Sequence, residues 1–199
     1  MQTTTNKLTG IKMSIEPGKS LAAIGALLLV IGTFIPFLGI IGFILLMIGL
    51  KNLADYYQDR RIFDNALYGI IFGIIGVAAA AFLIVAVVFG GSFLGFQFAP
   101  GGDITGNLFA FFGGIAIALV VAFIFYILMA IYLRKSFDAL ANKSGVGMFR
   151  TAGLLLLIGA VLTIILIGII LIFVAWILLT VAFFSMSSAP PPPAQVAPV

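Results

Sequence analysis

The sequence predicts an all-α membrane protein, a six-segment transmembrane helix bundle made of three hairpins. Its first and last hairpins are short, so re-entrant hairpins remain an alternative to full spans. Of the 199 residues, 63% are hydrophobic and 8% are charged, whereas roughly 25% charge is typical of soluble domains. The charges are confined to short stretches between long apolar intervals. Three hairpins also place all ten Lys and Arg residues on one side of the membrane, as the positive-inside rule requires.

The first uncharged interval is too long for one span. As a single helix, Ser20 to Leu50 would measure about 45 Å, against about 30 Å of bilayer hydrocarbon. Pro36 disfavours a helical conformation at Ile35. We therefore predict two short helices, Ser20 to Thr33 and Phe37 to Tyr57.

The next two intervals each hold one comfortable span, Ala66 to Phe89 and Leu108 to Leu133. The last interval, Thr151 to Met186, again exceeds one membrane thickness and must be divided. It contains no proline, so local chemistry favours a division near Leu162 to Ile165 only weakly. The distribution of charge decides in its favour.

Orientation follows from the basic residues, because cytoplasmic loops collect Lys and Arg. A single first span would separate Lys7, Lys12 and Lys19 from the other seven basic residues. With six segments, the opposite side receives only Asp103 and the glycine-rich connection 90–107. We expect a multi-pass protein of the cell membrane with cytoplasmic N- and C-termini.

This topology divides the chain into three parts. Residues 1–19 are expected to form a polar cytoplasmic segment, and residues 20–186 the transmembrane domain. Residues 187–199 are uncharged and proline-rich, a composition typical of an extended or disordered tail.

Small residues mark where helices can approach closely in a membrane. The third span carries them at steps of three and four, which predicts a helix-packing seam of Ala66, Gly69, Gly73, Gly76 and Ala80. The fourth span repeats the pattern every four residues at Ala110, Gly114, Ala118 and Ala122. The two spans are expected to pack tightly, either against each other or across a dimer.

Basic residues at the span ends form a predicted cytoplasmic basic patch of Arg60, Arg61, Arg134 and Lys135. Such a patch could contact anionic lipid head groups or a docking partner. Alternatively, the charges form solvated pairs four residues apart on one helix face, namely Lys51 with Asp55, Arg60 with Asp64 and Arg134 with Asp138. The expected partners are the lipid bilayer and either a second copy or another membrane protein. No nucleic acid partner is expected.

The chain contains no His and no Cys. Imidazole bases, thiol nucleophiles, His- or Cys-ligated zinc and iron–sulfur clusters are therefore excluded. We expect no enzyme, no cofactor and no metal site. The favoured function is a structural or partner-binding membrane component. A small-solute transporter or channel is the alternative, in which a broken helix at Gly32 to Gly39 lines the site.

Two segments resemble a known family. LKNLADYYQDRRIFDNALYGIIFGIIG (Leu50 to Gly76) and FRTAGLLLLIGAVLTIILIG (Phe149 to Gly168) are similar to the archaeal membrane family catalogued as domain of unknown function 996. The resemblance covers the chain from about Leu21 to Met186. It implies an archaeal multi-pass membrane protein without an assigned activity, and it transfers no functional residues.

Overall fold

The computed structural model describes residues 15–89 and 104–187, and within these ranges it contains helices and no strands. Six of the helices are long and apolar enough to span a membrane, which confirms the predicted fold class. In chain order the elements are α1 (Ile15–Gly32), α2 (Pro36–Tyr57), α3 (Arg61–Phe89), α4 (Ile104–Ser144), α5 (Met148–Leu162), the 3₁₀ turn η1 (Thr163–Ile165) and α6 (Ile167–Phe184).

Both predicted divisions of the long intervals lie where helices end. Pro36 is the first residue of α2, a position where its missing N–H costs no hydrogen bond. The preceding Ile35 is extended, with φ −126° and ψ 92°, as the residue before a proline prefers. The second division is made without proline, beside a close backbone approach of Gly159 and Gly168. There η1 is followed by Leu166 in the left-handed region, at φ 64°.

Three helices are longer than their predicted apolar spans, and one of them, α3, begins at Arg61 rather than at Ala66. Helix α1 begins at Ile15, inside the segment 1–19 that we expected to precede the membrane domain. Helix α4 continues past Leu133 to Ser144. Counting uncharged residues finds only the apolar part of a helix, whereas the hydrogen-bonded helix continues through its charged turns.

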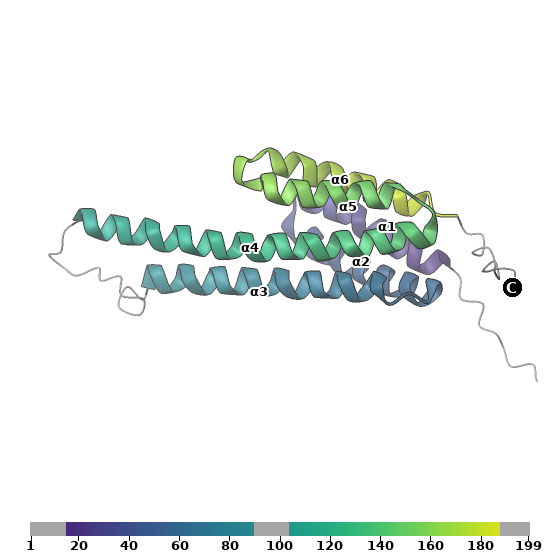
Figure 1. Cartoon of the computed structure of the whole chain (residues 1–199), viewed down its shortest axis with the longest axis horizontal. Helices are drawn as coiled ribbons and strands as arrows, with labels where there is room; N and C mark the ends of the chain where they lie inside the picture. Colours follow the sequence, from purple (N-terminus) through teal and green to yellow (C-terminus); the bar gives the residue numbers. More distant parts are fainter. Residues whose placement is uncertain (1–14, 90–103, 188–199) are drawn as a thin grey trace, which may run out of the picture.

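The helices form three antiparallel hairpins, α1/α2, α3/α4 and α5/α6 (Figure 1), and contacts between the hairpins close them into a ring. Contacts join α2 to α3, α4 to α5, and α6 back to α1. The contact between α2 and α3 is the least extensive of these. The bundle is therefore loosest along the α2–α3 boundary.

The hydrophobic core lies at the end where the short connections 58–60 and 145–147 are found. Its largest fully buried side chains include Phe137, Phe149 and Phe183, and the rings of the last two meet edge to face at 4.8 Å. Lys19 Nζ of α1 donates a hydrogen bond of 2.8 Å to the Met186 carbonyl beyond α6. Ser136 Oγ of α4 donates to the Ile62 carbonyl of α3. Packing and polar contacts together hold this charged end closed.

The α3/α4 hairpin extends well past the tips of the two short hairpins (Figure 1). Beyond its last charged residue, Lys19, helix α1 continues for about 20 Å. Helix α3 continues for about 38 Å beyond its last charged residue, Asp64. The tips of the short hairpins are apolar, and Phe34 and Ile164 are 76% and 71% exposed.

Hydrogen bonds within the tips satisfy much of their backbone. At the first tip, the N–H groups of Thr33 and Phe34 donate to carbonyls of the preceding turn at 3.3 and 2.9 Å. Thr163 Oγ1 at the second tip donates to the Gly159 carbonyl at 2.8 Å. Internal satisfaction of this kind is required of backbone in an apolar environment. Apolar side chains and internally bonded turns are both suited to tips that lie in hydrocarbon.

Candidate functional site

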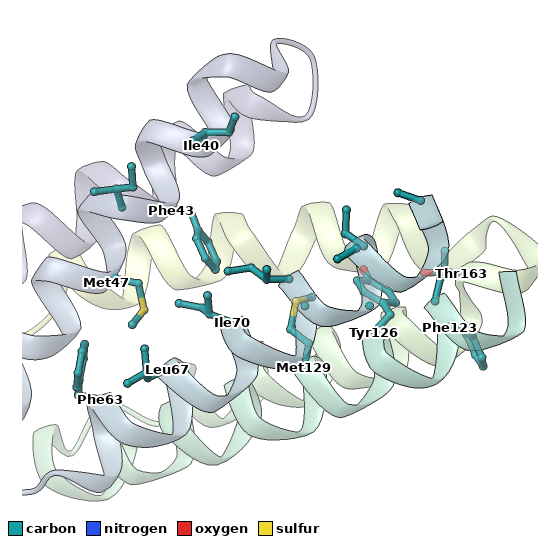
Figure 2. A pocket seen from close by; sticks show the side chains of 18 of the residues that line it. Ile40, Phe43, Met47, Phe63, Leu67, Ile70, Phe123, Tyr126, Met129 and Thr163 are labelled. Carbon is teal, nitrogen blue, oxygen red and sulfur yellow. The ribbon is translucent and has the colours of Figure 1, made fainter. Parts of the chain in front are cut away.

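The loose boundary between α2 and α3 opens into a cavity of about 1340 Å³. Small-molecule sites usually measure about 300–1,000 Å³, so this space could hold a larger occupant. Figure 2 shows Met47 of α2 and Leu67 of α3 facing one another across it, with Tyr126 and Met129 of α4 behind. We call this space the α2–α3 cavity.

The lining of the α2–α3 cavity is almost entirely apolar. Lys51 is the one charged residue among its lining residues, and it lies at the charged end of α2. Tyr126 and Thr163 bring hydroxyl groups to the other part of the cavity (Figure 2). The Thr163 hydroxyl already donates its hydrogen bond to Gly159. This apolar surface is suited to contact with hydrocarbon, and it carries a single cation at one end.

A second pocket of about 250 Å³ lies beside this cation, among residues of the charged end. Lys51 and Phe63 line both spaces. The second pocket adds Ala54, Asp55, Arg60 and Asp64. We call it the polar pocket. Two residues of the apolar cavity thus also line a pocket that carries two cations and two carboxylates.

The predicted seam forms the contact of α3 with α4 and part of the cavity floor. Ala66 is fully buried and Ala80 is half-buried. A Cβ at Gly69 would lie 3.1 Å from the Met129 carbonyl oxygen, and one at Gly76 would lie 2.5 Å from Phe125 Cβ. The seam thus lies against a helix of the same chain.

The two small-residue stripes approach each other at Gly76, where an added Cβ would lie 3.8 Å from the Ala122 carbonyl oxygen, but elsewhere they face large side chains. Gly73 of α3 lies opposite Met129 Sδ, 2.7 Å from an added Cβ. In the other half of the hairpin, Gly114 of α4 lies opposite the Val87 side chain. Large side chains of each helix therefore fill the space left by small residues of the other.

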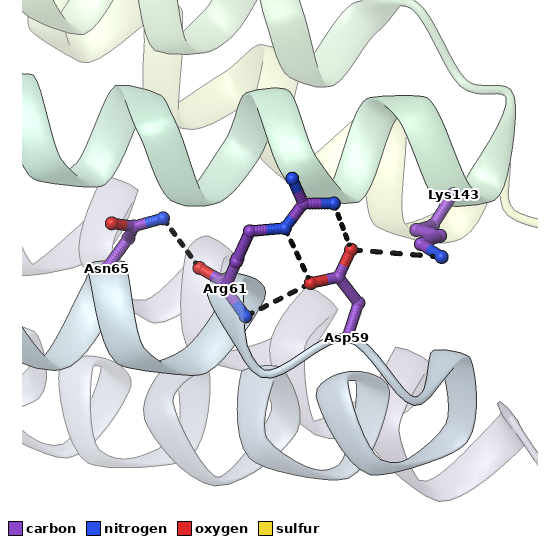
Figure 3. Close-up of polar contacts among 4 residues, drawn as sticks. All are labelled: Asp59, Arg61, Asn65 and Lys143. Carbon is purple, nitrogen blue, oxygen red and sulfur yellow. Dashed lines mark hydrogen bonds and ion pairs between the residues drawn. The ribbon is translucent and has the colours of Figure 1, made fainter.

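The four residues of the predicted basic patch share one end of the bundle but have different partners. Arg61 pairs with Asp59 through two side-chain hydrogen bonds, at 2.9 and 2.7 Å (Figure 3). Arg134 Nε lies 3.7 Å from Asp138 Oδ2, and Lys135 Nζ lies 4.8 Å from the centroid of the Tyr132 ring. Arg60 lines the polar pocket. The structure therefore distributes these cations over several local contacts.

Of the three predicted pairs at a spacing of four, Arg134 with Asp138 is an ion pair. For Lys51 with Asp55 and for Arg60 with Asp64, the described residues show no N···O distance within 4 Å. Arg60 precedes the first residue of α3. Its carbonyl nevertheless accepts a helical hydrogen bond from the Asp64 N–H at 2.8 Å, so the spacing of four is present without an ion pair.

Asp59 joins the α2–α3 connection to the end of α4, a role that the sequence analysis missed. It is 7% exposed, and Lys143 Nζ lies 3.8 Å from its Oδ2. Its Oδ1 also accepts the backbone N–H of Arg61 at 3.1 Å, as acidic residues before a helix commonly do. The hydrogen bonds from the Arg61 guanidinium hold the pKa of the Asp59 carboxyl below its usual value. The available signal was an acidic residue in the short polar stretch 58–65 between the second and third predicted helices.

The tightest helix contacts were also missed, because they lie in the short hairpins. A Cβ on Gly25 of α1 would lie 2.6 Å from the Gly42 carbonyl oxygen and 2.8 Å from Leu46 Cα. A Cβ on Gly49 would lie 2.7 Å from Ala22 Cα. These glycines lie in the short helices, whereas the predicted small-residue stripes lie in the two long spans.

Comparison with known proteins places these features in a family. The model of the family described as "Protein of unknown function (DUF996)" matches residues 38–177. The chain belongs to this family. A curated relative, an uncharacterized protein of Methanocaldococcus jannaschii, is 35% identical over 182 residues, which cover 88% of this chain and 95% of the relative. No solved structure matches the chain.

The DUF996 match includes the elements that form the α2–α3 cavity. Residues 38–177 contain nearly all of α2 and the whole of α3, α4 and η1. The expected resemblance to an archaeal family of this type is confirmed. Because the family has no assigned activity, the function must be argued from the cavity itself.

Proposed function

We propose that this DUF996 protein is a multi-pass component of the cell membrane that binds a partner within the bilayer, and that it is not an enzyme. The α2–α3 cavity carries the proposal. Its lining is apolar, and it opens along the loosest boundary of the bundle. A membrane-embedded partner could therefore enter from the side, without crossing water.

The proposed orientation places the charged end and both termini in the cytoplasm. The described basic residues from Lys19 to Arg150 all belong to the charged end of the bundle. Retention of basic loops on the cytoplasmic side supports this orientation.

A small-solute transporter or channel would need polar groups along a path across the membrane. Among the residues that line the α2–α3 cavity, only Lys51, Tyr126 and Thr163 carry polar side chains. This chemistry favours an apolar partner over a hydrated solute. Flux of small solutes into vesicles that contain the purified protein would support the alternative.

Photo-crosslinking in native membranes tests partner binding. A benzoylphenylalanine at Ile44, inside the α2–α3 cavity, is compared with one at Val85, which does not line it. The two residues are matched in exposure, at 54% and 53%. We expect a discrete product from Ile44 and a heterogeneous set from Val85. Identical product patterns at the two positions would refute partner binding in the cavity.

A further inference from the structure

The position of Lys51 points to the chemistry of the occupant. This lysine is exposed and lines the α2–α3 cavity at the end nearest the charged end. Among the described residues, no carboxylate oxygen lies within 4 Å of its ammonium group. A cation at the end of an apolar cavity is complementary to an amphiphile with an anionic head.

The polar pocket extends this complementarity. Beyond Lys51 it offers the guanidinium of Arg60, and the carboxylates of Asp55 and Asp64 are on the same lining. Two cations suit a phosphate group, and two carboxylates suit hydroxyl or amine donors attached to it. The head group of a phospholipid combines these groups at the end of hydrocarbon chains.

We propose that the α2–α3 cavity binds a membrane phospholipid, with its chains in the cavity and its phosphate at Lys51 and Arg60. This inference rests on the proposed function and specifies the partner. The lipid enters sideways between α2 and α3, where the two helices contact each other least. Its head group stays at the charged end, where the basic residues of the bundle gather.

The experiment uses the full chain, purified in detergent and stripped of lipid. Phosphatidylglycerol and a diacylglycerol with the same acyl chains are added separately, and native mass spectrometry measures the bound fraction. The two lipids differ in their phosphate-bearing head group, so their affinity ratio reports its recognition. One cation at the membrane interface raises the affinity for an anionic head group about fivefold, which is equivalent to about 1 kcal/mol of binding free energy. We expect phosphatidylglycerol to bind at least fivefold more tightly than diacylglycerol.

Two matched variants locate the head-group site. Lys51→Ala should lower the affinity for phosphatidylglycerol about fivefold and leave that for diacylglycerol unchanged. Lys135→Ala removes the same charge from α4 outside the cavity and should preserve the preference. Equal losses of affinity for phosphatidylglycerol in both variants would indicate general attraction of an anionic lipid to a basic protein. That result would refute a head-group site at Lys51.

A third variant tests where the acyl chains of the lipid bind. Ala78 is exposed and lines the α2–α3 cavity, so Ala78→Trp fills space without entering the core. It should weaken binding of both lipids, and unchanged binding would place the chains elsewhere. If wild-type protein does not discriminate between the lipids while Ile44 still crosslinks a discrete protein, the lipid inference fails and partner binding stands. Failure of both experiments removes both proposals.

Discussion

Gly25→Ala tests whether backbone contact holds the α1/α2 hairpin together. The added Cβ would lie 2.6 Å from the Gly42 carbonyl oxygen and close to the Leu46 nitrogen. These two groups are the acceptor and donor of a helical i to i+4 hydrogen bond in α2. Backbone atoms cannot rotate away as a side chain does. The helices must therefore separate by about 0.8 Å (3.4 − 2.6) to restore ordinary contact at the oxygen.

Gly113→Ala is the matched control, because a Cβ there meets nothing within 4 Å. Both substitutions gain the same helix propensity, up to about 1 kcal/mol relative to glycine. Only Gly25→Ala adds overpacking, which typically costs about 1–3 kcal/mol. The free energy of unfolding should therefore be lower for Gly25→Ala than for Gly113→Ala by about 1–3 kcal/mol.

Unfolding in mixed micelles with an increasing fraction of denaturing detergent, followed by circular dichroism, measures this difference. Gly73→Ala adds a graded case, because its Cβ would meet the flexible Met129 side chain. The free energy of unfolding of Gly73→Ala should be close to that of Gly113→Ala. If Gly25→Ala proves as stable as Gly113→Ala, the α1/α2 contact is looser than described and the argument from backbone contact fails.

Four further outcomes are expected. A cysteine at Ser92 should react with an impermeant thiol reagent in intact cells, whereas one at the exposed Asn142 should not; the reverse pattern would invert the orientation. Asp59→Asn should lower the thermal midpoint at pH 7. The difference should begin to shrink as the pH falls toward the ordinary pKa of 3.8 and should vanish only below the depressed pKa of Asp59 in the folded protein, where the carboxyl is protonated in both states. Deleting residues 189–199 should leave the thermal midpoint unchanged, and a clear decrease would show that the tail packs. A spin label at Phe34 should collide with oxygen and not with a water-soluble nickel complex; efficient nickel collisions would place this tip in water.

The orientation experiment also shows why the structure is needed to choose positions. Ser136 follows two basic residues and looks accessible in the sequence. In the structure it is fully buried, and its hydroxyl donates to the Ile62 carbonyl. A cysteine there would resist labelling from either side. Asn142, two turns further along α4, is exposed.

The three hairpins could be predicted from the sequence because membrane thickness limits the length of a single helical span. An uncharged interval longer than this limit must be divided. Counting showed that both long intervals must be divided, Pro36 located the first division, and the distribution of charge supported the second one near Leu162 to Ile165. Two other features depend on which helices become neighbours. Asp59 reaches Lys143 across 84 positions of sequence, and Gly25 meets Gly42 only after the chain has turned. No local pattern encodes those encounters, and the α2–α3 cavity depends on them in the same way.

The unequal hairpins give the protein different lateral areas at different depths. Near the charged end all six helices displace lipid, whereas beyond the tips only α3 and α4 continue (Figure 1). In a bilayer of about 30 Å, the monolayer at the charged end therefore loses more area to each molecule than the opposite monolayer. At high density, molecules inserted in one orientation would expand one monolayer relative to the other. The membrane would then bend, with its convex side at the charged end of the bundle.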